Sequence, residues 1–169
     1  RCPSRGDQEV EVLQRGRVGF SVTIAPRGGR PEHAEQPGRI LHEVRRGEAV
    51  RRGGGWGEVY YGSVDATPLF VTLAGELTRW GFWPEVEGSL LPAVDKALDW
   101  ITQYGDFDGD GFVEYARATD KGLLNQGWKD SWDGVNFADG RLASPPIALC
   151  EVQGYVYAAY ISRALMAQS

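Results

Sequence analysis

The sequence predicts a mainly α-helical protein with a short β-rich segment near its N-terminus. Apolar residues recur at helical spacing in three stretches, 65–80, 84–104 and 145–167. Alternation of apolar and polar residues is confined to residues 8–26. Helices are therefore expected over most of the chain, and strands only near its start.

Two short strands are expected between Gln8 and Pro26. Apolar and polar residues alternate on both sides of Gly16, which is a turn residue. Residues 26–31 hold two prolines and two glycines, which end this β unit. We therefore divide the chain into a β-rich remnant, residues 1–31, and a helical domain, residues 32–169.

The first helix is expected to follow Asp65, which is a suitable N-cap, with Pro68 inside its first turn. A second helix spans residues 84–104, and the short connection between the two makes them an antiparallel hairpin. The predicted core faces are Leu69, Phe70, Leu73, Leu77 and Trp80 in the first helix, and Val86, Leu90, Leu91, Val94, Leu98 and Ile101 in the second.

The third helix is expected from Pro145 to Ala167, with Pro145 and Pro146 in its first turn. Cys150 lies in its apolar run, so we expect a small buried side chain. The other cysteine, Cys2, is far away in the sequence, and neither a disulfide framework nor a zinc site is indicated.

Length and charge limit the classes of function. A chain of 169 residues with 42% hydrophobic residues allows one ordinary domain with a core. The net charge of −5 argues against nucleic acid or an anionic membrane as the main partner. No apolar run approaches the ~18 residues of a membrane span. We expect a cytoplasmic protein that binds a neutral glycan.

The stretch 123–133 has the composition of a sugar site. Indole faces stack on pyranose rings, amides bind hydroxyls, and a carboxyl group beside tryptophan loses hydration, which favours a proton donor. We predict Asp130 as the catalytic acid. Alternatively, both tryptophans fill the core and the aspartates cap turns. The predicted substrate-binding neighbours are Asn125, Gln126, Trp128, Lys129, Trp132 and Asp133.

Tyr60, Tyr61 and Asp65 precede the first predicted helix and are further candidates for substrate binding. The alternative is that the tyrosines pack in the core and Asp65 only caps the helix. Residues 35–48 contain charges of both signs around a proline and a glycine, which predicts a solvated loop with salt bridges.

A calcium loop is suggested by Asp106, Asp108 and Asp110, which are followed by Gly111, as in the first half of an EF-hand. Position 12 of such a loop requires glutamate, but here it is Arg117. The alternative is an acidic turn whose carboxylates bind their own backbone. A short strand, residues 112–115, is expected to follow.

Four motifs follow one another along the chain: YYGSVDATPLF at 60–70, DFDGDGFVEY at 106–115, the stretch 123–133, and IALCEVQGY at 147–155. In this order they resemble segments of bacterial glycogen debranching enzymes in the six-hairpin glycosidase superfamily. The resemblance covers residues 35–167. It implies an (α/α)6 barrel of helical hairpins, of which a chain of this length would be a fragment.

The resemblance also implies the chemistry of an α-1,6-glucosidase on an oligosaccharide or glycogen-like α-glucan, with no cofactor required. Asp130 resembles the acid, while the base is a late-helix glutamate that no residue here matches. Glu151, Gln153 and Tyr155 would lie near the sugar, and Arg39, His42 and Glu43 at the barrel mouth. From spacing alone, residues 151–155 could equally be a wet helix face.

Two other hypotheses remain open. The chain could be a non-catalytic carbohydrate-binding or calcium-stabilised module, in which Tyr60, Tyr61, Trp128 and Trp132 form a stacking platform. It could also belong to a trehalase-like or mannosylglycerate-hydrolase-like glycosidase. Sugar binding that survives Asp130→Asn, and the products released from a glycan panel, distinguish these hypotheses from a debranching enzyme.

Overall fold

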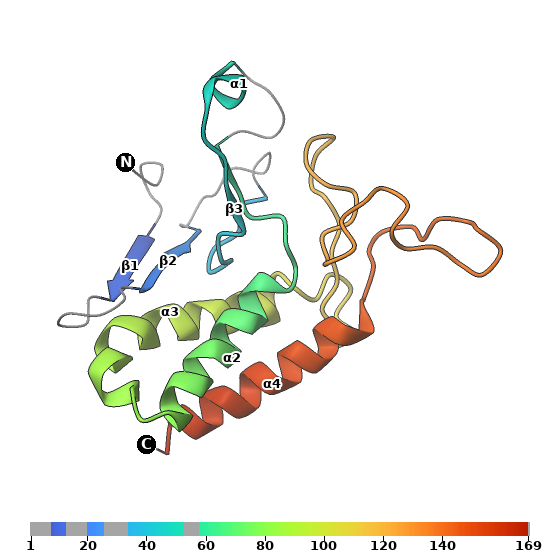
Figure 1. Cartoon of the computed structure of the whole chain (residues 1–169). Coiled ribbons are helices and arrows are strands. Elements are labelled where there is room, and N and C mark those ends of the chain that lie inside the picture. The colour runs from blue at the N-terminus through green and yellow to red at the C-terminus, as the bar shows by residue number, and fades with distance from the viewer. Residues whose placement is uncertain (1–7, 13–19, 26–33, 53–57, 169) are drawn as a thin grey trace.

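The computed structural model describes residues 8–12, 20–25, 34–52 and 58–168, and in these the chain is mainly helical. The three long helices are α2 (Ala66–Arg79), α3 (Trp83–Gln103) and α4 (Cys150–Met166). They lie together, while the segments between residues 105 and 149 rise from one end of the group as long loops (Figure 1). The predicted fold class is thus confirmed at the level of helix content.

Helices α2 and α3 form the expected antiparallel hairpin. Gly81, with φ 80°, makes the turn between them, and the Phe82 N–H donates to the Leu77 carbonyl at 2.9 Å. Helix α4 packs against α2 and runs in the same direction (Figure 1). Their close approach depends on Gly75, because a Cβ there would lie 2.5 Å from Ser162 Cβ.

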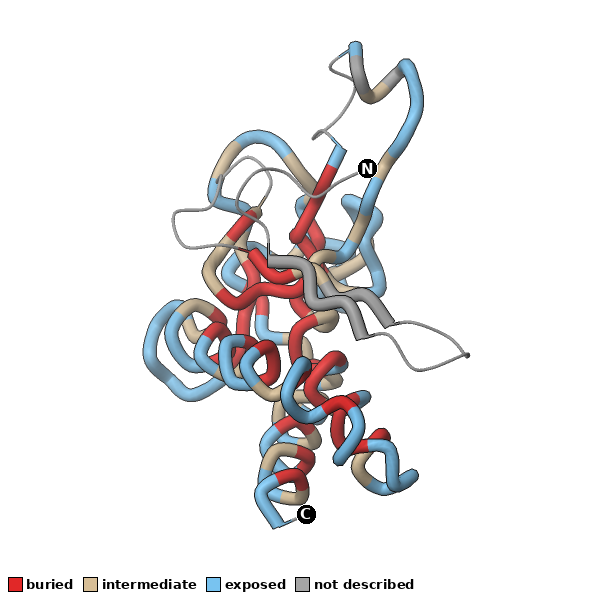
Figure 2. The backbone as a smooth tube through the Cα atoms, turned by 90° about the vertical axis from the view of Figure 1, so that its left-hand side faces the viewer, coloured by how far each residue is buried: buried red, intermediate tan, exposed pale blue. Residues whose placement is uncertain are grey.

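The hydrophobic core lies where the three helices meet each other and the strand segments, as the red segments in Figure 2 show. The prediction for α3 is largely right, since four of its six core positions are buried and Leu91 and Leu98 are partly buried. The fully buried side chains also include Trp83 and Trp100, which were not predicted.

The predicted core face of α2 is wrong at three positions. Leu69, Leu73 and Trp80 are 42%, 52% and 71% exposed. The helix packs between α3 and α4 through Phe70 and Leu77 of the predicted face together with smaller residues, and the two leucines face outward. Its buried residues are Thr67, Pro68, Phe70, Val71, Ala74, Gly75 and Leu77.

Helix α4 begins five residues later than predicted. The backbones of Ile147 and Tyr115 pair through two N–H to carbonyl bonds of 3.1 Å, which keeps the segment before α4 extended. This single bridge also replaces the strand expected at 112–115. Cys150 is consequently the first residue of α4 and is exposed, contrary to the prediction.

The start of α2 is also capped differently. Asp65 occupies the N-cap position, but its carboxylate accepts no capping hydrogen bond. The Ala66 N–H instead donates to the Ser63 hydroxyl oxygen at 3.3 Å, and that hydroxyl donates to the Asp65 carboxylate. Asp65 therefore supports the cap indirectly.

The two predicted N-terminal strands are present as an antiparallel pair, β1 (Gln8–Val12) and β2 (Phe20–Ile24). Residues 38–41 continue the pairing beside β2, because the Leu41 N–H donates to the Thr23 carbonyl at 2.9 Å. Ile24 belongs to the same core as the helices. The proposed boundary after residue 31 therefore does not separate two cores among the described residues.

A second small sheet pairs β3 (Glu43–Val44) with β4 (Val59–Tyr60), and the single-turn helix α1 (Glu48–Arg51) lies between them in the chain. None of these three elements was predicted from the sequence. The turns predicted at Gly16 and at residues 26–31 lie outside the described residues. Across the parts of the chain that are described, every helix is too short or too polar to cross a membrane.

Substitution of two helical glycines tests the packing of α2 on α4. Gly75→Ala should lower the free energy of unfolding by about 1–3 kcal/mol, because the added methyl group overlaps Ser162. The control is Gly88→Ala in α3, where nothing lies within 4 Å, and it should raise stability by roughly 0.5–1 kcal/mol. Urea unfolding measures both. Equal effects would contradict the close approach.

Candidate functional site

The stretch 123–133 is anchored through its two amide residues, which are buried. The Asn125 Oδ1 accepts a hydrogen bond from the Tyr115 hydroxyl at 3.0 Å, and its Nδ2 donates to the Ser131 carbonyl. The Gln126 main-chain carbonyl accepts the Val64 N–H at 2.7 Å. Asn125 therefore shapes the loop from within, and the prediction that it binds a ligand hydroxyl has no support in its contacts.

Beneath this loop lies the guanidinium of Arg39, which is only 4% exposed. Its NH2 group donates to Gln126 Oε1 at 2.9 Å, and its Cζ lies 5.1 Å from the centre of the Trp100 ring. Burial lowers the pKa of Arg39 to about 10. The prediction of a solvated loop at residues 35–48 is therefore wrong for Arg39 and also for Glu35, which is 6% exposed.

A small pocket, which we call the Asp130 pocket, opens above Gln126. Its volume is about 110 Å³. Segments from three parts of the chain form it, and two of its polar side chains are carboxylates, those of Asp65 and Asp130. The lining residues are His42, Gly62, Ser63, Asp65, Leu123, Gln126, Gly127, Trp128 and Asp130.

A larger pocket of about 440 Å³, the Glu151 pocket, shares Trp128 as a wall. The Trp128 Nε1–H donates to Glu151 Oε1 at 2.8 Å, and Lys129 Nζ lies 5.2 Å from the centre of the indole ring. These contacts hold one edge of the ring, and Trp128 is 67% exposed. The other lining residues are Gly134, Val135, Asn136 and Leu149.

The carboxyl group of Glu151 is held in its charged form. Its pKa is below the usual range, chiefly because its own backbone N–H donates to the carboxylate. The Cys150 thiol, the Trp128 indole and the Lys129 charge add to this effect, while burial opposes it. Glu151 is thus suited to accept hydrogen bonds and unsuited to donate a proton.

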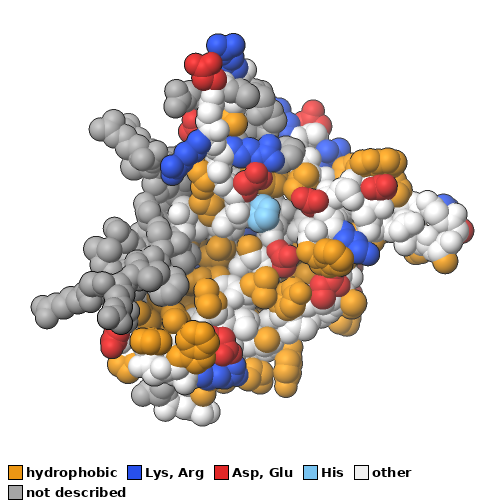
Figure 3. Space-filling model, in the orientation of Figure 1, with side chains coloured by type: hydrophobic (Ala, Val, Ile, Leu, Met, Phe, Trp, Pro, Cys, Tyr) orange, Lys and Arg blue, Asp and Glu red, His pale blue; other side chains and the backbone are white. Residues whose placement is uncertain are grey.

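The side chain of Asp130 is exposed, as are those of Lys129 and Asp133. The desolvation expected from the neighbouring indoles is therefore not provided by the described residues. Trp132 is 67% exposed, so the alternative in which both tryptophans fill the core is also wrong. Acidic and hydrophobic side chains are interspersed on the face of the molecule shown in Figure 3.

Three predicted substrate-binding residues have structural contacts instead. Tyr60 and Tyr61 are 2% and 0% exposed, so neither ring offers a face for stacking. The Tyr60 hydroxyl accepts the Leu123 N–H at 2.8 Å, and burial raises the pKa of this phenol. The Gln153 amide bonds to both backbone groups of Val113, which ties the acidic loop to α4.

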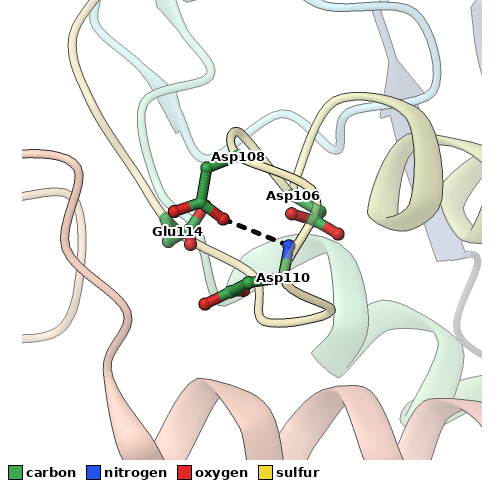
Figure 4. A group of neighbouring side chains, drawn as sticks. All are labelled: Asp106, Asp108, Asp110 and Glu114. Atoms are coloured by element: carbon green, nitrogen blue, oxygen red, sulfur yellow. Dashed lines mark hydrogen bonds between the residues drawn. The ribbon is translucent and has the colours of Figure 1, made fainter.

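The acidic loop gathers four carboxylates, which Figure 4 shows turned toward one another. Ligand oxygens of Asp106, Asp108, Asp110 and Glu114 lie within 4.8 Å of one another, an arrangement that could hold a calcium ion. The three aspartates also accept backbone N–H groups of the loop, as in the alternative acidic turn. Glu114 was not predicted as a ligand, because it falls at position 9 of an EF-hand loop, where ligation often passes through water.

Several residues that line the two pockets were not predicted as site residues, namely Gly62, Ser63, Gly134, Val135, Asn136 and Leu149. Val135 and Asn136 belong to no motif with recognisable chemistry, and they lie in a loop that folds back through a bridge between Asn136 and Leu142. Leu149 lies within the motif at 147–155 but was not predicted as a site residue, and it is the N-cap residue of α4. Ser63 could have been recognised as a helix cap, because a capping serine accepts the backbone N–H two or three residues later. Ala66, the first residue of α2, lies three residues after Ser63.

The pH dependence of stability tests the environment of Glu114. Burial raises its pKa above the ordinary 4.5, and the three aspartates add to the shift. Its stabilising contribution is therefore complete below pH 4.5 and is lost as the pH rises through the folded-state pKa. Glu114→Gln should be more stable than the wild type at pH 7, by urea unfolding, with an advantage that shrinks toward pH 4.5.

The same variant tests calcium binding. If the four carboxylates hold calcium, millimolar calcium should raise the unfolding temperature of the wild type more than that of Glu114→Gln. An unfolding temperature of the wild type that calcium does not change would contradict calcium binding and support the acidic turn. A variant less stable than the wild type at pH 7 without calcium would contradict the assignment of a raised pKa.

No protein-family model, curated protein or solved structure matches this chain. The assignment of a function therefore rests on the two pockets beside Trp128 and on the four sequence motifs.

Proposed function

We propose that this chain forms part of a glycoside hydrolase of the glycogen-debranching type, which acts on α-linked glucosides with Asp130 as its proton donor. One observation carries the proposal. The exposed indole of Trp128 stands between two pockets, one lined by Asp130 and Asp65 and the other by Glu151 and Lys129. An apolar ring face flanked by carboxylates complements the C–H face and the hydroxyls of a sugar.

The arrangement of the helices supports an (α/α)6 barrel as the complete fold. In a ring of antiparallel hairpins, the first helices of successive hairpins run parallel to each other, as α2 and α4 do (Figure 1). Both pockets draw residues from the segments next to the N-terminal ends of α2 and α4, namely Asp65 and Glu151. Backbone N–H groups at helix N-termini favour negative charge there.

The proposed role of Asp130 is to donate a proton to the glycosidic oxygen. An inverting hydrolase also needs a carboxylate about 6.5–9.5 Å away, across the sugar ring, to activate water. Asp65 lines the same pocket but accepts the Ser63 hydroxyl hydrogen. The resemblance assigns water activation to a glutamate that no residue here matches. We therefore assign an acid and no base.

A second candidate function is non-catalytic carbohydrate binding. It is favoured by the exposure of Asp130, because the described residues leave this carboxyl group in contact with water. The exposed indoles of Trp128 and Trp132 would serve this function equally well. The two functions differ in whether Asp130 is needed for bond cleavage.

Sugar binding tests the role of Trp128. Trp128→Ala should weaken binding of isomaltotriose about tenfold or more, because tryptophan is enriched among interface residues whose truncation costs ~2 kcal/mol or more. Trp80→Ala is the matched control, since Trp80 is 71% exposed and lines neither pocket. Titration calorimetry measures both. Equal affinities of the two variants would remove Trp128 from the site.

Glucose release tests the role of Asp130. The isolated chain should release little or no glucose from isomaltotriose or branched α-glucan, because no residue of the sequence matches the glutamate that would activate water. Release above that of buffer, lost in Asp130→Asn, would show that the chain is active and that Asp130 is required. Release that persists in the variant would instead remove Asp130 as the acid. Sugar binding without release in either protein would favour the non-catalytic function.

A further inference from the structure

The side-chain amide of Gln126 has one end occupied and one end without a partner. Its Oε1 accepts the hydrogen bond from Arg39, whereas its Nε2 has no hydrogen-bond partner among the described residues. The side chain is only 2% exposed. Because buried amide groups are normally hydrogen-bonded, an unpaired donor beside a pocket calls for an acceptor from a ligand.

Arg39 determines which end of the amide is the donor. A guanidinium can only donate hydrogen bonds, so the end of Gln126 that meets it must be the carbonyl oxygen. The NH2 group is then directed away from Arg39. A bond from a charged donor also polarises the amide, which strengthens Nε2–H as a donor to the next group.

The guanidinium is itself fixed in place. Its NH1 donates to the Ala34 carbonyl at 3.2 Å and to Gln36 Oε1 at 3.3 Å, and Gln36 Oε1 also accepts the Trp100 indole N–H at 2.8 Å. Gly38 lies against α3 so closely that a Cβ would be 2.1 Å from the Lys96 carbonyl oxygen. The Arg39 charge cannot turn away from Gln126 without breaking these contacts.

We propose that Arg39 is a positioning residue, which fixes Gln126 Nε2 as a hydrogen-bond donor to an oxygen of the glucoside in the Asp130 pocket. The inference rests on the proposed function and adds a determinant of substrate recognition to it. A sugar hydroxyl both donates and accepts, and the pocket offers the matching pair, the carboxylates of Asp65 and Asp130 and the amide of Gln126. Its volume of about 110 Å³ suits the hydroxyl-bearing edge of one ring.

The test exchanges the donor for an acceptor while the fold is kept. Gln126→Glu leaves an oxygen for Arg39 and supplies the buried cation with a counter-charge, so the unfolding temperature should not fall. Binding of isomaltotriose, measured by titration calorimetry, should weaken at least tenfold, about 1.4 kcal/mol, because the donor is lost. A merely structural Gln126 would leave the affinity unchanged.

Gln36→Glu is the matched control. It places the same carboxylate on the other side-chain acceptor of Arg39, and Gln36 lines neither pocket. Its sugar affinity should stay within about twofold of the wild type, well under the 1.4 kcal/mol of a tenfold change. Affinity lost equally in both variants would overturn the inference, because the charge beside Arg39 would then be the cause.

A spectroscopic measurement tests the positioning by Arg39. The side-chain NH2 signals of Gln126, identified by their absence in Gln126→Glu, should shift when isomaltotriose is added to the wild type. In Arg39→Met this shift should be lost. Sugar binding by Gln126→Glu at wild-type affinity would overturn this inference alone. A wild type that binds neither isomaltotriose nor maltotriose would overturn the proposed function together with it.

Discussion

The burial of one cation constrains much of this structure. Arg39 is nearly inaccessible to water, and its hydrogen bonds to described residues all go to neutral oxygens. Burial of a charge costs several kcal/mol unless hydrogen bonds and packing compensate. The compensation comes from three separate places: the segment 34–36, the Trp100 ring on α3, and Gln126. The charge therefore joins the helices to the loop that lines both pockets.

The packing of α2 on α4 brings the walls of the site together. The two helices approach closely at Gly75 and Ser162 and run in the same direction, so their N-terminal ends lie on one side. Asp65 precedes α2 and Glu151 belongs to the first turn of α4. Trp128 lines one pocket with Asp65 and the other with Glu151, so one indole serves both pockets.

The glutamates of this region have opposite electrostatic environments. Glu114 is buried beside three aspartates, which raises its pKa. Glu151 accepts hydrogen bonds from its own backbone N–H, the Cys150 thiol and the Trp128 indole, which lower its pKa. Gln153 connects their surroundings through its bonds to the Val113 backbone and to the Leu149 carbonyl. The acidic loop is thus attached directly to the start of α4, because Gln153 bonds the backbone of Val113, the neighbour of Glu114.

The sequence by itself determined the helices at 66–79 and 83–103 and the turn at Gly81, because helical periodicity and turn preference depend on residues close together in the chain. Tertiary structure alone decided that Leu69 and Leu73 face outward and that Tyr60 is buried. It also decided that α4 begins only after the bridge between Tyr115 and Ile147. It also joined Arg39 to Gln126, 87 residues apart. The physical reason is that periodicity shows only that a helix has an apolar face. The segment that packs against this face, and the buried polar contacts, depend on parts of the chain that folding brings together.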